Sequence, residues 1–163
     1  KGVIKSLSLM DDLSISTKNI KKGLLNVINN TGLRGRWEII NQSPKTILDV
    51  GHNLEAFKET IKAFDEITFG ELRIVIGFVK GKNFEKILRS LPKDAYYYFC
   101  QPDINRALKV EEIFNYSKKI GIKGKSFLNV KSAYQCCCDE SRKEDLIFIG
   151  GSNFIVSDII KLV

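Results

Sequence analysis

The stretch RGRWEIINQSPKTILDVGHN, residues 34–53, decides the fold of this chain. It holds two segments rich in β-branched and aromatic residues, RWEIIN (36–41) and KTILDV (45–50), separated by Gln42-Ser43-Pro44. Two β-rich runs joined by turn residues predict a hairpin. Asn53 is a good N-cap, so a helix is expected to begin directly after the second strand. The stretch therefore predicts a hairpin that leads into a helix.

Strand-like and helix-like segments alternate from there to the end of the chain. The expected strands are 72–78, 95–100, 125–129 and 145–151, and the expected helices are 53–64, 84–91, 110–120, a segment over the Cys136–Cys138 run, and 154–162. Repeated strand–helix units imply a mainly parallel sheet with helices on both faces, to which the hairpin adds one antiparallel strand. We therefore expect an α/β, Rossmann-like domain. The chain has no GxGxxG and no GxxxxGK[ST] motif, so the main phosphate-binding loop is not in it.

The first thirty residues differ, because their apolar residues recur at helical spacing over 3–13 and 17–28. Ser16 or Thr17 can cap the second helix, and the run ending in Gly32 is a helix stop signal. The chain begins at Lys1 and its single Met is residue 10. We interpret it as a piece of a longer protein, with residues 1–30 and 31–163 belonging to different parts.

Composition narrows the class of protein. The chain has 163 residues, of which 44% are hydrophobic and 28% charged, a balance typical of one globular domain. No apolar run approaches the roughly 20 residues that span a bilayer, so we expect no membrane association and a cytoplasmic location. The four cysteines, Cys100 and Cys136–Cys138, are interpreted as reduced, partly buried thiols. With one His and no ligand spacing, no protein metal site is expected.

The net charge of +7, from 26 Lys and Arg against 19 Asp and Glu, suits an anionic partner such as a nucleotide or nucleic acid. The basic residues are dispersed and no aromatic–basic motif accompanies them, which favours solvated surface positions. A non-catalytic, Rossmann-like module that binds nucleic acid remains an alternative. It predicts oligonucleotide binding that weakens steeply as ionic strength rises, and absence of binding at low salt would contradict it.

Polar residues gather where the second hairpin strand ends. If the turn is centred near Ser43, Arg36 and Asp49 face each other and can form a cross-strand ion pair, a purely structural interpretation. A ligand site is the other interpretation, because ligands of open α/β sheets bind where strands end and helices begin. His52 lies at that junction. At the end of the last strand, Ser152 follows a Gly-Gly turn in the same way.

These residues stand in register with a known family. TGLRGRWEII and TILDVGHN resemble the start of the C-terminal domain of folylpolyglutamate synthase, often bifunctional with dihydrofolate synthase, in the Mur ligase superfamily. IGFVKGKNFEKIL, NRAL and FIGGSNFIVSDI resemble its later landmarks in the right order, so the likeness covers residues 31–163. Two departures are Gly51 and Leu54 in place of the usual Ala and Pro, and Gly81-Lys82-Asn83 in place of an acidic loop.

The resemblance implies an ATP-dependent amide ligase, in which an acyl phosphate made from ATP is attacked by the amine of L-glutamate. The carboxylate substrate would be a reduced folate or dihydropteroate. An N-terminal ATPase domain, of which residues 1–30 would be the tail, would hold the P-loop and Mg²⁺, so this piece alone should be inactive. The protein is expected to be a monomer without nucleic-acid or membrane partners. A Mur-superfamily ligase for another amino acid remains an alternative.

The resemblance also implies roles for single residues. Arg36 would contact the ATP phosphates and Asp49 would accept hydrogen bonds from the ribose hydroxyls. His52 would act catalytically, near the phosphates and the incoming glutamate, and Ser152 would help bind glutamate. Lys80 and Arg106 are weaker candidates for the anion-binding cleft.

Overall fold

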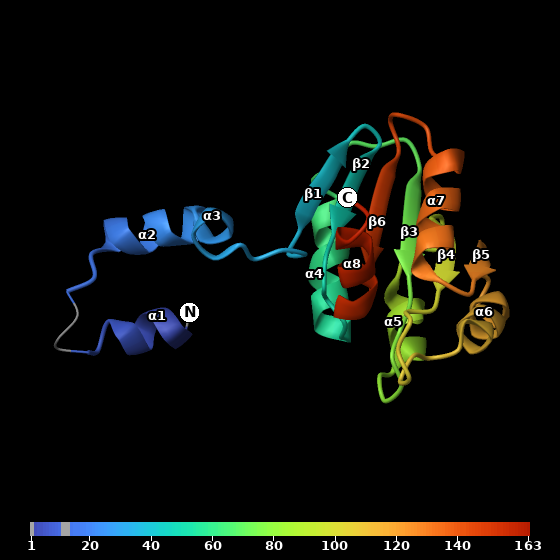
Figure 1. Cartoon of the computed structure of the whole chain (residues 1–163), viewed down its shortest axis with the longest axis horizontal. Helices are drawn as coiled ribbons and strands as arrows, with labels where there is room; N and C mark the ends of the chain where they lie inside the picture. The colour runs from blue at the N-terminus through green and yellow to red at the C-terminus, as the bar shows by residue number, and fades with distance from the viewer. Residues whose placement is uncertain (1, 11–13) are drawn as a thin grey trace. The chain divides into compact units, whose positions relative to one another are not determined.

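The computed structural model describes residues 2–10 and 14–163, which fall into two compact units divided between Arg34 and Gly35. The first unit holds the helices α1 (Gly2–Leu7), α2 (Thr17–Leu25) and α3 (Val27–Thr31) (Figure 1). Residues 11–13 of the first predicted helix lie outside the described residues. The assignment of residues 1–30 to a preceding domain stays a prediction.

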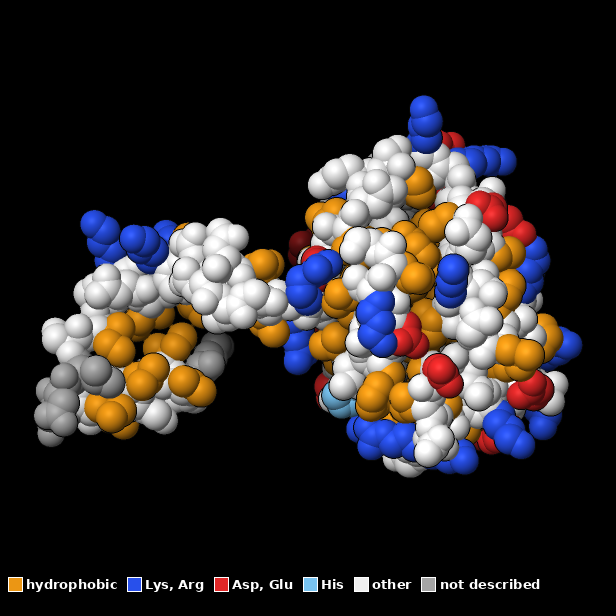
Figure 2. Space-filling model, viewed as in Figure 1, with side chains coloured by type: hydrophobic (Ala, Val, Ile, Leu, Met, Phe, Trp, Pro, Cys, Tyr) orange, Lys and Arg blue, Asp and Glu red, His pale blue; other side chains and the backbone are white. Residues whose placement is uncertain are grey.

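Local capping accounts for the ends of these helices. Ser16 is the N-cap of α2, since its Oγ accepts the N–H of Asn19 at 3.2 Å. Gly32 ends α3 with a φ of 64°, and its N–H donates to the carbonyl of Ile28. None of the described residues of this unit is buried, several apolar side chains such as Val3 and Leu25 are exposed, and orange side chains gather on it in Figure 2.

The second unit is built on a six-stranded sheet in the order β1-β2-β6-β3-β4-β5. Its strands are β1 (Glu38–Gln42), β2 (Lys45–Leu48), β3 (Leu72–Ile76), β4 (Tyr96–Cys100), β5 (Gly124–Phe127) and β6 (Leu146–Gly150). Only β1 and β2 pair antiparallel, and all other neighbours are parallel. This arrangement confirms the predicted α/β sheet with one antiparallel hairpin strand.

Helices cover both faces of the sheet, as predicted (Figure 1). On one face lie α4 (Leu54–Phe64), α5 (Phe84–Ser90) and α6 (Val110–Lys119), and on the other α7 (Val130–Glu140) and α8 (Asn153–Ile160). Every residue of β3 and β6 is buried, because both strands are covered on two sides. Their nearly continuous apolar sequences, LRIVI and LIFIG, are what such central strands require.

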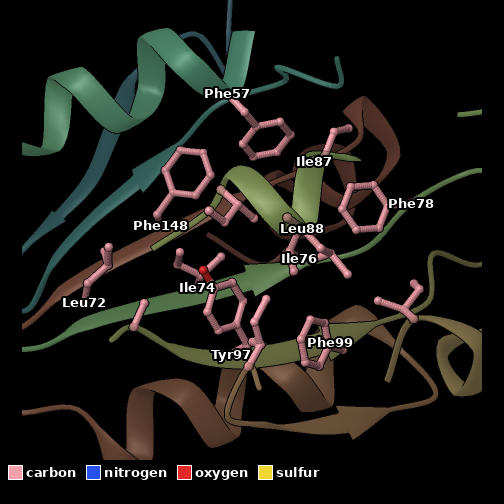
Figure 3. Packing of buried hydrophobic residues seen from close by; sticks show 14 of the residues in the cluster. Phe57, Leu72, Ile74, Ile76, Phe78, Ile87, Leu88, Tyr97, Phe99 and Phe148 are labelled. Carbon is pink, nitrogen blue, oxygen red and sulfur yellow. The ribbon is translucent and has the colours of Figure 1, made fainter. Parts of the chain in front are cut away.

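Aromatic side chains fill much of the core on the α4 side (Figure 3). Phe148 of β6 packs edge-on against Phe64, with ring centroids 5.4 Å apart, and also against Phe57. Tyr97 stacks on Phe99 along β4 at 5.5 Å. Such pairs contribute about 0.5–1.5 kcal/mol each beyond the burial of their area. The contacts between Phe148 and α4 hold that helix against the sheet.

The cysteines form no disulfide among the described residues. All four cysteines are free, and burial raises the pKa of the Cys100 and Cys137 thiols. Cys136 is less buried and its Sγ lies 3.5 Å from Glu140 Oε1. Among the described residues, no helix is long and apolar enough to cross a membrane.

Arg73 is the one charged residue inside β3. Its Nε donates to Asp145 Oδ2 at 2.9 Å, and its other nitrogens donate to Glu71 and to the Tyr98 hydroxyl. Burial alone would raise the pKa of Asp145. Hydrogen bonds from the Arg142 N–H, the Arg73 guanidinium and the Glu71 N–H outweigh burial and hold that pKa below its ordinary value.

Replacing Asp145 by Asn should lower the free energy of unfolding by about 3 kcal/mol, because it leaves the buried Arg73 without its best-buried partner. In the wild type, the folded-state pKa of Asp145 lies below the unfolded one. Its stabilisation is therefore present above the unfolded pKa and is lost as pH falls through the folded pKa. Urea unfolding as a function of pH measures both effects. Glu71→Gln is the control, since the Glu71 side chain is 59% exposed and should matter by about 0.5 kcal/mol or less. Equal losses of unfolding free energy in the two variants would contradict the conclusion that Asp145 is the main partner of the buried Arg73.

Candidate functional site

The hairpin differs from its prediction at the open end. Glu38 pairs with Leu48 and begins β1, two residues later than the predicted strand, so Arg36 lies before the ladder. Within the described residues, no ion pair joins Arg36 to Asp49, and the predicted cross-strand pair is therefore wrong. Trp37, rather than Arg36, comes opposite Asp49.

The Asp49 carboxylate joins the two ends of this hairpin. Its Oδ2 accepts the N–H of Trp37 at 3.0 Å, and its Oδ1 accepts the N–H of Gly51 at 2.7 Å. We call these two hydrogen bonds the Asp49 bridge. The main chain of Asp49 is itself held on β6, because its N–H donates to the carbonyl of Ile149 at 3.0 Å. Asp49 thus connects the start of β1, the end of β2 and the turn before α4.

The segment around Arg36 has an unusual backbone. Gly35 has a φ of 69° and Trp37 a φ of 49°, a left-handed value that is uncommon for a residue with a side chain. The Gly35 carbonyl accepts the N–H of Val50 at 2.9 Å. The Trp37 ring lies 6.1 Å from the Phe64 ring. Arg36 is therefore held on both sides while its own side chain is exposed to solvent.

His52 lies in the turn before α4. Its side chain is exposed, and its Nδ1 lies 3.1 Å from the carbonyl oxygen of Val50. Asn53 caps the helix, since its Oδ1 accepts the N–H of Ala56 at 2.8 Å. The predicted cap is confirmed. The imidazole is left at the surface, close in sequence to the Asp49 bridge.

Ser152 is placed differently from the other predicted residues. It is 1% exposed, and its Oγ accepts the N–H of Phe154 at 3.2 Å as the N-cap of α8. Gly151, with a φ of 92°, passes so close to the next strand that a Cβ would lie 2.6 Å from the carbonyl oxygen of Gly77. The Ser152 hydroxyl is therefore packed into the end of β6 rather than presented at the surface.

These residues lie where the carboxyl ends of β2, β6 and β3 meet, because the three strands run parallel and are neighbours. We call this end of the sheet its carboxyl edge, or simply the edge. The chain leaves β2 and β3 for helices on one face and leaves β6 for α8 on the other. Ligands of open α/β sheets bind at such a divergence, outside the carboxyl ends of the strands. The structure thus brings together Arg36, Asp49 and His52 around β2, with Ser152 at the end of the adjacent strand.

Two weaker candidates are connected to the same edge. The N–H of Lys80 donates to the Arg106 carbonyl at 2.9 Å, which ties together the loops that follow β3 and β4. The Arg106 guanidinium lies over the Phe154 ring, 5.1 Å from its centroid, in the first turn of α8. The sequence analysis did not predict that Phe154 packs under the Arg106 guanidinium or that the Trp37 N–H donates to Asp49. Only the uniqueness of Trp37 in the sequence marked it out.

The residues on this edge suit anions better than metals. Over residues 2–10 and 14–163, no group of three His, Cys, Asp or Glu side chains could hold a metal ion. Arg36 and His52 are exposed, and Arg36 makes no ion pair within the same residues. An exposed guanidinium is a planar fork that matches phosphate and carboxylate oxygens.

Comparison with known proteins gives a consistent result. A sequence model of the family "Mur ligase, glutamate ligase domain" matches residues 35–153. A dihydrofolate synthase/folylpolyglutamate synthase of Buchnera aphidicola (Schizaphis graminum) is 31% identical over 147 residues, which cover 88% of this chain and 34% of that protein. The Escherichia coli enzyme of the same name is 27% identical over 155 residues, 93% of this chain and 34% of the relative.

Solved structures resemble the chain as well. The structure of E. coli FolC in complex with DHPP and ADP superimposes with a TM-score of 0.81 at 25% identity, covering 92% of this chain and 35% of that one. The Yersinia pestis bifunctional folylpolyglutamate synthase/dihydrofolate synthase, complexed with AMPPNP and Mn ion, has a TM-score of 0.80 at 21% identity and shows the same fold. The chain spans about a third of the length of the relatives it matches.

Gly35→Ala tests whether the Arg36 segment needs its close packing. A Cβ there would lie 2.6 Å from Val156 Cγ1 of α8, in addition to the cost of a positive φ. Gly121→Ala is the matched control, because it has a φ of 77° and nothing within 4 Å of the added Cβ. We expect a loss of about 1 kcal/mol for Gly121→Ala from backbone strain. For Gly35→Ala we expect about 2–4 kcal/mol, since overpacking adds to strain. The measurement is chemical unfolding. Equal losses of unfolding free energy in the two variants would contradict the idea that Gly35 is needed for close packing.

Proposed function

The chain belongs to the Mur ligase family through its glutamate ligase domain, and from this premise we propose that it is the C-terminal domain of an ATP-dependent folylpolyglutamate synthase. The relatives named above, which are dihydrofolate synthase/folylpolyglutamate synthases, support this proposal. Because the chain matches only about a third of their length, the activity belongs to the longer protein. We place that protein in the cytoplasm. The isolated domain should not catalyse the reaction.

The proposed reaction joins L-glutamate to a folate carboxylate. The carboxylate attacks the γ-phosphorus of ATP, so that an acyl phosphate forms and ADP leaves. The amine of glutamate then attacks the acyl carbon, an amide bond forms, and phosphate and a proton are released. An acyl phosphate is easily hydrolysed, so a domain that closes over it and excludes water is of direct use.

One observation carries the proposal: Arg36 and His52 are both exposed, and the Asp49 bridge holds the backbone directly after Arg36 and directly before His52, at the edge where ligands of such sheets bind. In the proposed site the Arg36 guanidinium contacts the phosphates. The imidazole of His52 lies beside the phosphates and the incoming glutamate. Asp49 belongs to the nucleotide side of the same site.

The remaining candidates take secondary places in the proposal. Ser152 can contribute its hydroxyl hydrogen to glutamate only where the end of β6 is approached closely, because its oxygen already caps α8. Lys80 and Arg106 add positive charge to the edge.

Magnesium is proposed to act with ATP, but the described part of this chain does not supply a metal site. We therefore attribute binding of the ion to the rest of the longer protein and to the phosphates themselves. Relatives solved with ADP, AMPPNP and Mn support the use of a nucleotide and a divalent metal in the family. The residues of this domain contribute binding and orientation.

The dispersed basic residues do not favour the alternative of a nucleic-acid-binding module. Figure 2 shows Lys and Arg spread over the visible face of the second unit among Asp and Glu, without a continuous basic stripe. Nucleic-acid sites depend on such a concentration of positive charge. The other alternative, a ligase of the same family for another amino acid, is distinguished from the proposed function by measuring ADP release with different amino acids.

The test is release of ADP by the full-length protein, supplied with Mg-ATP, a reduced folate and L-glutamate, with each omitted in turn. We expect release that requires both the folate and the glutamate. Replacing the folate by dihydropteroate tests the second activity of the bifunctional relatives. Release with a different carboxylate or amino acid, and not with these, would keep the ligase chemistry and reject the substrates. Absence of release with every combination would contradict the proposal.

A further inference from the structure

We propose that Lys80 and Arg106 form a subsite for the glutamate tail that the acceptor folate already carries, so that this domain favours acceptors with several carboxylates. The inference rests on the proposed function for its reaction, and it adds a binding site for the part of the acceptor that grows. This subsite is separate from the contacts to the nucleotide and to the incoming glutamate.

The first argument is how the backbone arranges the two side chains. Val79 and Ala107 form an antiparallel bridge between the loops that follow β3 and β4. Lys80 and Arg106 are the next pair along this bridge, so they lie opposite each other, and the Lys80 N–H donates to the Arg106 carbonyl at 2.9 Å. Val79 and Ala107 are buried, whereas Lys80 and Arg106 are exposed. Two cations are thereby held side by side at the carboxyl edge.

The second argument is that these two charges are not neutralised. Like charges directly opposite each other destabilise an antiparallel pair. Among the described residues, neither Lys80 nor Arg106 makes an ion pair, although Glu85 and Asp103 are close to them in sequence. A carboxylate of a ligand, placed between the two side chains, would remove the repulsion and supply both with a partner.

The third argument is that Arg106 is oriented before any ligand binds. Its guanidinium lies over the Phe154 ring, 5.1 Å from the ring centroid, in the first turn of α8. A guanidinium that stacks on an aromatic ring keeps N–H groups at its rim for planar anions such as carboxylates. Because the side chain is already held, less conformational freedom is lost when it binds a carboxylate.

The position of the pair in the sheet favours the tail over the incoming glutamate. Arg36 and His52 lie around β2, and β3 is the second neighbour of β2 in the order β2-β6-β3. Adjacent strands lie about 4.8 Å apart, so the ends of β2 and β3 are separated by about 10 Å. One γ-linked glutamyl residue extends about 6 Å, estimated from ordinary bond lengths. A tail of two residues spans the separation, whereas a single glutamate that reacts beside His52 spans about half of it.

The surroundings of the pair suit a chain of variable length. Gly81 directly follows Lys80, and a Cβ added to it would meet nothing within 4 Å. Gly81 and Asn83 stand where the family resemblance has acidic residues, so these two positions place no negative charge beside the tail. Figure 2 shows Lys and Arg side chains close together at the lower end of the second unit, where the loops after β3 and β4 lie in Figure 1. A small ligand is typically enclosed in a pocket, whereas a growing tail needs an open path.

Calorimetric titration of the full-length protein with a γ-linked triglutamate peptide tests the subsite without turnover. Lys80→Gln and Arg106→Gln should each raise the Kd by about threefold to fivefold, the range of one exposed ion pair. The difference from wild type should shrink as salt screens the charges. Lys93→Gln and Arg142→Gln are the matched controls and should leave the Kd unchanged, because both side chains are exposed and precede β4 and β6, at the opposite end of the sheet. Absence of binding to the wild type, or equal losses in the controls, would overturn the inference.

Turnover by the full-length enzyme then separates the anions of the reaction. The acceptors are reduced folates that carry one or three glutamates. The double variant Lys80→Gln/Arg106→Gln should raise the KM for the triglutamate by about tenfold, the product of the single effects. The KM values for the monoglutamate, for L-glutamate and for ATP should stay unchanged. A raised KM for L-glutamate or for ATP, with the same ratio between the two folates as in wild type, would assign the pair to another ligand and overturn the inference.

A stability measurement distinguishes the subsite from a merely structural role. Because Lys80 faces Arg106, Lys80→Gln removes a repulsion and should leave the urea midpoint of unfolding unchanged or raise it. A clearly lower midpoint would show that Lys80 is needed for the fold and would contradict the inference. If the wild-type enzyme shows no turnover with any folate, the proposed function fails, whereas the titration with the peptide still decides whether the subsite exists.

Discussion

The second unit depends on the insertion of β6, the last strand of the chain, between β2 and β3. Ile149 pairs with Leu48 on one side and with Val75 on the other, so the parallel sheet is continuous only when β6 is in place. The fit is close: a Cβ on Gly150 would lie 2.9 Å from the carbonyl oxygen of Asp49. Residues 49 and 152, 103 positions apart in sequence, therefore lie at the same edge.

The candidate site is a consequence of that insertion together with one carboxylate. The backbone of Asp49 is bonded to β6, and its side chain reaches both the start of the hairpin and the turn before α4. The flexible groups of the site, Arg36 and His52, are thus attached to the most buried part of the sheet. In the proposed function the domain meets a nucleotide that is held largely by the rest of the protein, and this rigidity would reduce the conformational entropy lost on binding.

The order and type of the elements in the second unit could be predicted from the sequence, because each rests on local signals. The apolar runs of β3 and β6 indicated central strands, and Asn53 acts as the expected cap of α4. The candidate site could be predicted only in part. Its residues follow from motif and position, but the predicted ion pair between Arg36 and Asp49 was wrong. A shift of one residue placed Trp37 opposite Asp49, and the positive φ at Trp37 has no local sequence signal.

By itself, the sequence determined the alternation of strands and helices, the hairpin, the family resemblance and the residues that gather where strands end. These depend on periodicity, on turn chemistry and on caps, which act over a few residues. Only the tertiary structure decided that β6 lies between β2 and β3, that Ser152 is buried as a helix cap, and that both Asp49 oxygens bind main-chain N–H groups. The physical reason is that hydrogen-bond partners and burial are set by contacts between segments far apart in the chain.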